Sequence, residues 1–531
     1  MPEKTSLNGS IARKWIFDLF LKNYIFIFFV AYLMIGVLAF DDYGISIDES
    51  YEIQTARITI NYVQGTSDRL LTYEDRHYGA LFSIPLEYAA ALFQDSREIF
   101  LFRHFATFLF FYFSVVVFYF TLRKLNFNKG SSLIGVAALI LQPHIFANSF
   151  YNSKDIPFFG LSILAFFTLL LFAEKKTHTS AILHGLISGI LVVFRIPGVL
   201  MWGTTLFVML LLFLNERSQW KKMLGLGILY LSIALAAVVL FLPALWHDPL
   251  HELLTMFSLD LLVWPNAELF LGKMITASTI PWYYLPLYFL VTTPLLYTTF
   301  FVFGSISLAW QSAKQFRVEN KFNINKAMIL TSFLLPVVAL LIGQPVVYNG
   351  WRHIFFLYPA FVMIMVSGFS SMVEKVGEIK GRSGFLSGLV FALVAFQFFS
   401  VGNFMVKSHP YQFTYYNFLA GPTLNVARNN FLMDYWGLSY RQALENILAK
   451  DTSEHITVTA KNPYYLSENL KILTDIQRQR LTVVEYGQAA DHFITNYEDS
   501  LETQLSGWTL TSAILVDDAI INGTYSPLTV P

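Results

Sequence analysis

The feature that most constrains this chain is a series of long apolar runs that are almost free of charge. A helix needs about 20 predominantly apolar residues to cross a bilayer. The runs lie near residues 23–40, 104–122, 131–147, 157–173, 181–195, 197–214, 224–246, 284–310, 327–346, 354–371 and 385–403. We therefore predict an α-helical polytopic membrane protein with about eleven transmembrane helices.

The composition agrees with a chain that spends most of its length in lipid. Charged residues make up 14% of the 531 residues, whereas a soluble globular chain carries about 25%. Hydrophobic residues make up 55%, and the net charge is zero. These values exclude a disordered protein, a nucleic-acid-binding protein with a basic face and an ordinary soluble enzyme. The chain has no cysteine, which excludes disulfides, thiolate metal sites and cysteine nucleophiles.

The basic residues of the short loops predict the orientation of the chain. They gather near residues 4–14, 123–129, 175–176, 217–222, 314–326 and 375–382, which all fall on one side if eleven spans are drawn. Basic loops mark the cytoplasmic side. We therefore expect an integral protein of the plasma (inner) membrane with a cytoplasmic N-terminus. A first loop (41–103), a large loop (247–283) and the C-terminal tail are expected on the outer side.

The tail has the spacing of a small folded unit. Residues 440–450 have helical periodicity, and residues 455–460, 481–486 and 491–496 alternate in the manner of strands. Residues 512–525 are typical of a hairpin that turns at Asp517 and Asp518. We predict a transmembrane domain over 1–403 and a small extracytoplasmic α/β domain over 404–531.

The first candidate site residues are Asp48 and Glu49, which follow the first span and precede an amphipathic stretch. A carboxylate at the membrane boundary can accept a proton from a hydroxyl while a lipid-borne group docks beside it. The alternative is an acidic first turn of a surface helix, stabilised by the helix dipole.

A second acidic loop lies between two spans on the same predicted side. It contains Asn152, Lys154 and Asp155, and it would place Asp155 level with Asp48. The alternative is a helix cap, in which Ser153 or Asp155 precedes Pro157.

A third outer loop contains Tyr348, Arg352 and His353. Arginine can hold a phosphate through two parallel hydrogen bonds, and the histidine would add a donor. The alternative is an arginine that extends to lipid headgroups beside interfacial aromatic residues. Arg195 is a further outer-side cation.

The large loop supplies weaker candidates. Lys273 could contact phosphate, and Trp282 and Tyr283 could form an aromatic belt or a groove for a lipid chain. His247, His251 and Glu268, with Glu252, are candidate ligands of a divalent metal ion, although their spacing matches no strong metal motif.

Together these features resemble the GT-C superfamily of membrane glycosyltransferases. The resemblance is carried by the acidic pair after the first span, the second Asp, the Pro-Trp-Tyr-Tyr segment 281–284 and the Arg-His loop. More narrowly, the chain resembles glycosyltransferase family 39, the protein O-mannosyltransferase-like group, which includes lipid A aminoarabinose transferase-like members. The segments 409–412 and 434–440 resemble bacterial members with an extracytoplasmic C-terminal domain.

The resemblance implies a GT-C helical bundle that inverts the anomeric centre of a sugar taken from a polyprenyl-phosphate donor. The acceptor would be a hydroxyl of a glycan, a lipid or a protein, although the large loop is too short for the domain that eukaryotic protein mannosyltransferases insert there. Asp48 matches the catalytic carboxylate of the family, Glu49 its usual neighbour and Asp155 the second acid. Arg352 and His353 would bind the donor phosphate.

Three other functions remain open on the sequence alone. A polytopic transporter or lipid flippase would place charged residues at mid-membrane, where few are found. A lipid-linked glycan polymerase or ligase and a non-catalytic scaffold are the other two. No cofactor other than a divalent metal ion is indicated, and the expected partners are the sugar lipid, its acceptor and membrane lipids.

Overall fold

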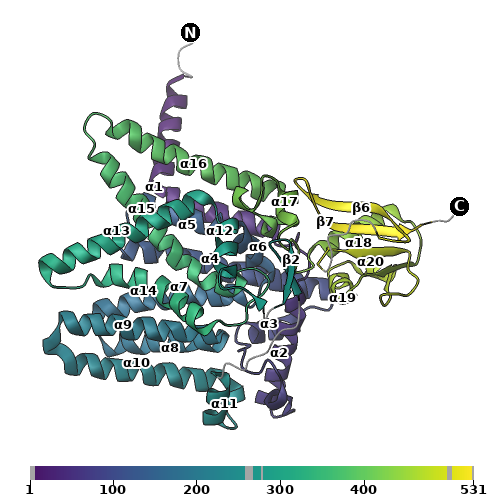
Figure 1. The fold of residues 1–531 in the computed structure, drawn as a ribbon, viewed down its shortest axis with the longest axis horizontal. Coiled ribbons are helices and arrows are strands. Elements are labelled where there is room, and N and C mark those ends of the chain that lie inside the picture. The colour runs from purple at the N-terminus through teal and green to yellow at the C-terminus, as the bar shows by residue number, and fades with distance from the viewer. Residues whose placement is uncertain (1–5, 258–266, 277–278, 499–504, 529–531) are drawn as a thin grey trace.

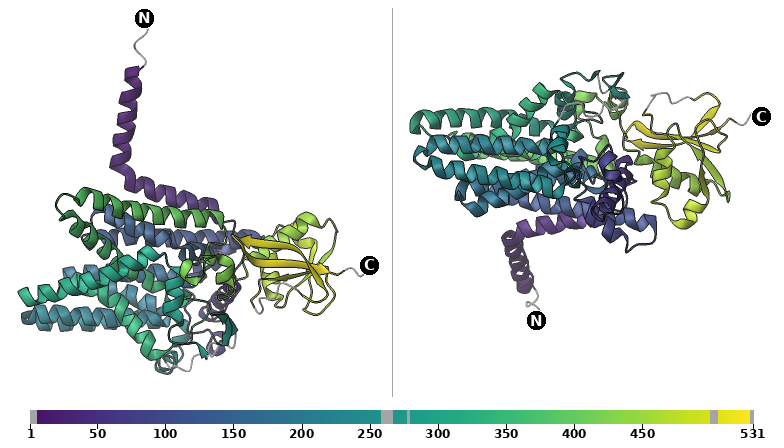
Figure 2. Two further views of the ribbon diagram at one scale, coloured as in Figure 1. Left: turned by 45° about the horizontal axis from the view of Figure 1, so that its top comes forward. Right: turned by 90° about the horizontal axis from the view of Figure 1, so that it is seen from below.

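The computed structural model describes residues 6–257, 267–276, 279–498 and 505–528. Figure 1 shows a bundle of long helices with a small domain of strands and short helices at one end, and both views in Figure 2 keep the domain at that end. The helices of the bundle are α1 (Ser6–Ala39), α4 (Ser96–Lys124), α5 (Lys129–Ile140), α6 (Pro143–Tyr151), α7 (Asp155–Lys175), α8 (His178–Phe194), α9 (Val199–Asn215), α10 (Trp220–Phe241), α12 (Tyr284–Thr292), α13 (Leu295–Glu319), α14 (Ile324–Gly343), α15 (Tyr358–Gly377) and α16 (Ser383–Lys407).

The polytopic helical class is confirmed. By length and composition, the described residues contain seven helices able to cross a membrane, or nine if each of two bent pairs is one span. The pair α5 and α6 is bent by 66°, and the pair α12 and α13 by 119°. The other two predicted spans correspond to shorter apolar helices, Asn23–Ala39 and His178–Phe194.

Proline explains where the two pairs break. Pro143 is the first residue of α6, and Pro294 immediately precedes α13. Proline lacks the amide hydrogen that would continue the preceding helix, and it also disfavours helical geometry in the residue before it. A continuous apolar run therefore folds as two helices with a sharp change of direction.

The core of the bundle lies around α7 and α15. The most apolar windows of these helices are 83% and 89% buried, whereas those of α14 and α16 are 17% and 22% buried. Helices α13 and α15 approach each other closely at Gly304 and Gly368. A Cβ at Gly304 would overlap the carbonyl oxygen of Ile364, and a Cβ at Gly368 would overlap that of Phe300. Small residues allow this contact between membrane helices.

Short elements cover the end of the bundle that carries the C-terminal domain. They are α2 (Ile47–Val63), η1 (Arg69–Thr72), α3 (Ser83–Ala90), α11 (Pro249–Met256) and the hairpin of β1 (Ala267–Phe270) and β2 (Lys273–Thr276). Helix α2 contains the stretch that was predicted to be amphipathic, and its buried residues include Glu49, Glu52, Thr55 and Thr59. Two 3₁₀ turns, η2 (Ile196–Gly198) and η6 (Arg352–Leu357), lead into α9 and α15.

The C-terminal domain contains a five-stranded sheet in the order β4-β3-β5-β7-β6. Strand β3 is parallel to β4 and β5, and β7 is antiparallel to β5 and β6. Its elements are α17 (Leu424–Arg428), α18 (Ser439–Lys450), β3 (Ile456–Thr459), α19 (Tyr464–Leu470), α20 (Asp475–Gln479), β4 (Leu481–Val483), β5 (His492–Thr495), β6 (Trp508–Val516) and β7 (Ala519–Pro527). The predicted helix, strands and hairpin are all present, and Asp517 adopts a positive φ of 47° at the turn.

Gly304→Leu is expected to separate α13 from α15 and to lower the free energy of unfolding by about 1–3 kcal/mol, as overpacking does in other cores. Thermal unfolding in detergent would measure the change. Gly388→Leu in α16 is the matched control, because a Cβ at Gly388 meets no atom within 4 Å. Equal effects of the two substitutions would contradict the close contact.

Candidate active site

The ends of several helices bring charged side chains together beside the C-terminal domain. Asp48 lies in the first turn of α2, and Asp155 is the first residue of α7. Arg195 follows α8, and Arg352 begins η6. We call these four residues, with Glu52 and Lys154, the charged cluster. Both aspartates lie at helix N-termini, where the helix dipole favours a negative charge.

Arg352 joins the two aspartates of the cluster. Its Nη1 lies 2.8 Å from Oδ2 of Asp48 and 3.5 Å from Oδ2 of Asp155. Arg195 forms a second ion pair with Asp155. The side chains of Arg352 and Asp155 are 3% and 1% exposed, whereas Asp48 is 25% exposed. Asp48 is therefore the carboxylate that an approaching molecule can reach.

The loop before α7 holds Asp155 in place. The amide nitrogen of Asn152 donates to Asp155 Oδ2 at 2.9 Å, and Asn152 Oδ1 accepts from the backbone N–H of Asp155 at 2.8 Å. The predicted caps, Ser153 and Asp155, do not cap the helix: the N-cap position is Lys154, which makes no side-chain cap bond.

Glu52 and Lys154 form a second charged pair next to Asp48. Lys154 Nζ lies 3.3 Å from Glu52 Oε1 and 4.3 Å from the centre of the Tyr78 ring. Glu52 was not among the predicted site residues, although it lies four residues after Asp48 and so shares its helix face.

The surroundings give the two carboxylates of α2 different acidities. Burial raises the pKa of Asp48, but the positive charges of Arg352 and Lys154 outweigh burial and hold this pKa below its ordinary value. Burial also raises the pKa of Glu52, and the attraction to Lys154 does not fully offset it. Asp48 is thus the group that stays ionised over the wider pH range.

Glu49 makes contacts that differ from those of Asp48. Its Oε2 accepts from the backbone N–H of Ser46 at 2.8 Å, which completes a capping box at the start of α2. Its Oε1 lies 3.0 Å from Nε2 of His104. These contacts fix the first turn of the helix that carries Asp48.

The loop that contains Tyr348 reaches the cluster, as predicted. Because Arg352 is buried, the alternative in which its side chain extends to lipid headgroups is excluded. The guanidinium lies 5.1 Å from the centre of the Tyr348 ring, which contacts the His353 ring edge-on at 4.8 Å. Nε of Arg352 and Nδ1 of His353 are buried and have no hydrogen-bond partner among the described residues. Each could serve a ligand.

Glu268 anchors this loop. Its carboxylate accepts from Tyr284 Oη at 2.6 Å, Tyr288 Oη at 2.9 Å and the backbone N–H groups of Asn349 and Gly350 at 2.7 and 3.2 Å. Asn349 and Gly350 have positive φ angles of 56° and 71°, so successive N–H groups converge on one anion. Glu268 therefore fixes the backbone just before Arg352.

The remaining candidates of the large loop are not brought into the cluster. Lys273 lies exposed on β2, and Trp282 and Tyr283 are also exposed, as in an aromatic belt. His247 and His251 are exposed, while Glu252 pairs with Arg76 and His77. Within the described residues no group of three or more His, Asp or Glu side chains is placed to hold a metal ion. The candidate metal site of His247, His251 and Glu268 is therefore not assembled.

A residue far along the chain completes the cluster. The indole of Trp436, fully buried, lies 4.7 Å from the guanidinium of Arg352. Segment 434–440, which contains Trp436, was predicted only to resemble a segment of bacterial members of family 39. No local pattern indicates which side chain such an aromatic residue will contact.

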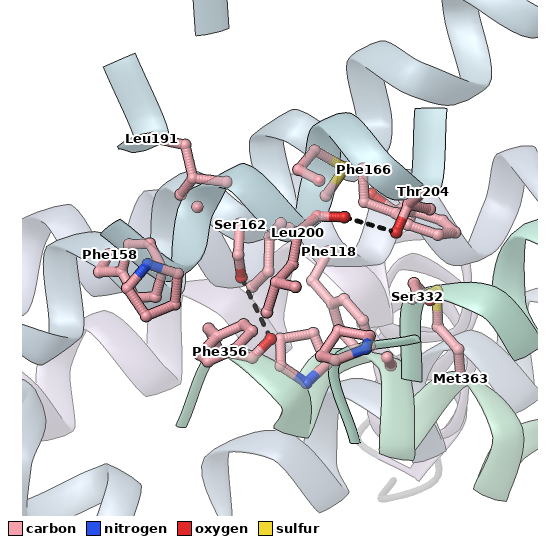
Figure 3. Close-up of a pocket in the computed structure, with 18 residues that line it drawn as sticks. Phe118, Phe158, Ser162, Phe166, Leu191, Leu200, Thr204, Ser332, Phe356 and Met363 are labelled. Atoms are coloured by element: carbon pink, nitrogen blue, oxygen red, sulfur yellow. Dashed lines mark hydrogen bonds between the residues drawn. The ribbon is translucent and has the colours of Figure 1, made fainter. Parts of the chain in front are cut away.

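An apolar cavity that opens to the outside lies inside the bundle. Figure 3 shows its lining, which includes Phe158, Leu191, Leu200, Thr204 and Phe356 from α7, α8, α9 and η6. Phe158 follows Asp155 by three residues, and Phe356 follows Arg352 by four. The cavity therefore lies within about one helical turn of the charged cluster along two elements.

Arg195→Met is expected to lower the free energy of unfolding by at least about 2 kcal/mol, because it removes one partner of a buried ion pair. The double variant with Asp155→Asn should lose less than the sum of the single variants, by about 1–3 kcal/mol. Denaturant unfolding of the four proteins would measure this coupling.

Arg217→Met serves as the control, because Arg217 is exposed and its loss should change stability by less than about 0.5 kcal/mol. Strictly additive effects of Arg195→Met and Asp155→Asn would show that the pair is not coupled.

No known family profile and no curated protein matches the chain significantly. Among solved structures, the chain is similar to the archaeal oligosaccharyltransferase AglB from Archaeoglobus fulgidus in complex with an inhibitory peptide and a dolichol-phosphate, with a TM-score of 0.51 and 11% identity. The match covers 87% of this chain and 64% of AglB, a little less than two thirds. ArnT from Cupriavidus metallidurans, bound to undecaprenyl phosphate, matches with a TM-score of 0.47 and 11% identity over 96% of this chain and 99% of that one. At such identity the similarity concerns the fold alone.

Proposed function

We propose that the protein is an inverting glycosyltransferase that moves a sugar, a mannose-like hexose or a pentose, from polyprenyl phosphate to an acceptor hydroxyl. The observation that carries the proposal is the charged cluster beside an apolar cavity. A sugar lipid combines a long apolar tail with a charged phosphate. The apolar cavity suits the tail, and the positive charges of the cluster suit the phosphate. The fold similarity to AglB, solved with a dolichol-phosphate, supports the same donor class.

The phosphate would bind at Arg352. Its Nε is buried and has no hydrogen-bond partner in the described part of the chain, while Nη1 holds Asp48. An arginine offers several donors in one plane, so it can hold a carboxylate and a phosphate at once. Lys154 adds a second positive charge. Lys273 remains a proposed contact that would require the β1–β2 hairpin to approach the ligand.

Asp48 would act as the proton acceptor. The acceptor oxygen attacks the first carbon of the sugar from the face opposite the phosphate, and the bond between that carbon and the phosphate oxygen breaks. The electron pair leaves with polyprenyl phosphate, whose charge Arg352 stabilises. The hydroxyl proton passes to Asp48, which is the reachable carboxylate of the cluster. Asp155 would orient Arg352, and Glu49 would hold the turn that carries Asp48.

The position of the charges favours this function over transport. Asp155 and Arg352 begin helical elements, and Arg195 follows one, so the cluster lies at helix ends. A transporter needs ionisable side chains along its path through the membrane. We propose that the cluster faces the outer side, together with the C-terminal domain.

Asp48→Asn is expected to reduce the rate of sugar transfer by about 10²–10⁴-fold, because the amide cannot accept the proton. Reconstituted protein would be supplied with labelled polyprenyl-phosphate hexoses and pentoses, and the release of polyprenyl phosphate would be measured. Asp42→Asn is the matched control, an exposed acid of the same segment that contacts His409. A rate equal to wild type in Asp48→Asn would exclude Asp48 as the base.

The pH profile tests the same assignment. Because the pKa of Asp48 is held below its ordinary value, transfer should persist as the pH falls to about 4 and decline only below that. Arg352→Met removes the largest of the positive charges that oppose burial, with Lys154 still present, and should move the decline to higher pH. If the decline at low pH occurs at the same pH in Arg352→Met as in the wild type, the ion pair between Asp48 and Arg352 does not set the pKa of Asp48.

Thr204→Phe tests the tail site. The larger ring would occupy part of the cavity, so the KM for a donor with an undecaprenyl chain should rise about tenfold, equivalent to about 1–2 kcal/mol. A donor with two isoprene units should be affected little. Leu206→Phe, at an exposed position of α9, is the control. Equal effects on long and short donors would place the tail elsewhere.

A further inference from the structure

The C-terminal domain presents a rigid turn, residues 434–437, to the charged cluster. The buried carboxylate of Asp434 accepts from the backbone N–H groups of Leu438 at 3.1 Å and Ser439 at 2.8 Å. The carbonyl of Asp434 accepts from Asn496 at 2.7 Å. Gly437 has a φ of 73°, and a Cβ there would overlap the ring of Tyr465. The turn is thus fixed from inside its own domain.

This turn contacts both partners of the ion pair between Asp48 and Arg352. The Trp436 indole lies 4.7 Å from the guanidinium of Arg352. The Trp436 carbonyl accepts from the backbone N–H of Ile47, the residue before Asp48, at 3.3 Å. One residue therefore touches the arginine with its side chain and the aspartate segment with its backbone.

A second contact ties the same segments together. Asn469 accepts from the backbone N–H of Ile45 at 3.0 Å and donates to the carbonyl of Gly437, also at 3.0 Å. Ser50, two residues after Asp48, donates to Glu468 and accepts from Lys471. The segment that carries Asp48 is thus held on both sides by residues of the C-terminal domain.

We infer that Trp436 is a positioning residue that supports Arg352, so that the C-terminal domain forms part of the active site. A flat aromatic face attracts a guanidinium and restricts it to a plane parallel to the ring. In that position Nη1 of Arg352 reaches Asp48 at 2.8 Å. The inference rests on the proposed function for its catalytic meaning, but the position of Arg352 can be measured without any substrate.

Phenylglyoxal labelling of arginine, read by peptide mass spectrometry on the full-length protein, measures that position. Arg352 is buried and should react slowly, whereas Arg57, 61% exposed, is an internal standard. Trp436→Leu should raise the labelling rate of Arg352 relative to Arg57 about fivefold or more, which is the effect expected from losing a cation–π contact. Trp436→Phe keeps a ring face and should recover most of the protection.

Trp508→Leu is the matched control, because Trp508 lies in the same domain and packs on Phe493, with ring centres 5.7 Å apart. Melting temperatures of all variants would be measured beside the labelling. If Arg352 stays protected in Trp436→Leu, or becomes equally reactive in Trp508→Leu, the inference is wrong.

Sugar transfer by the same proteins separates this inference from the proposed function. The rate at saturating donor should fall in Trp436→Leu and recover in part in Trp436→Phe. A wild-type protein that transfers no sugar would overturn the proposed function, while the labelling result would still decide the position of Arg352. An active wild type with unchanged labelling and rate in Trp436→Leu would overturn only the inference.

Discussion

The buried carboxylate of Asp155 determines how the helix ends of this protein meet. A charge that is 1% exposed is stable only when opposite charges and hydrogen-bond donors surround it. Arg195, Arg352 and Asn152 supply them, and they come from three different segments. The start of α7, the end of α8 and the start of η6 are therefore fixed to a common point. Asp48 is attached to that point through Arg352.

The charged cluster and the apolar cavity share structural elements. The charged groups lie at the ends of helical elements whose apolar residues line the cavity. The charged and apolar parts are therefore neighbours. The shared helices fix the distance between the two parts, because Phe158 and Phe356 line the cavity within a turn or so of Asp155 and Arg352. A ligand with a charged head and a long apolar tail would meet both parts at once.

Much of this arrangement could be predicted from the sequence, and the rest depends on long-range contacts. Apolar runs and strand alternation located the helices and the elements of the tail, since both patterns are local. Asp48, Asp155 and Arg352 were predicted on one side, and the structure brings them together. The contact between Trp436 and Arg352 could not be predicted, because no local sequence pattern links two residues so far apart in the chain. Glu268 was predicted as a candidate metal ligand, but the folded loop uses it as an anion anchor.

The contacts of Asn469 and Trp436 with the segment of Asp48 have a consequence for biosynthesis. Asp48 precedes α4 to α16 along the chain and Asn469 follows them, so the segment of Asp48 is synthesised well before Asn469. Domains generally fold as units in the order of synthesis. The bundle would therefore be in the membrane while its acidic segment still lacks the contacts that hold it. During synthesis there is thus a period in which the bundle is present but the segment of Asp48 lacks these contacts, and the C-terminal domain supplies them only after the bundle has been made.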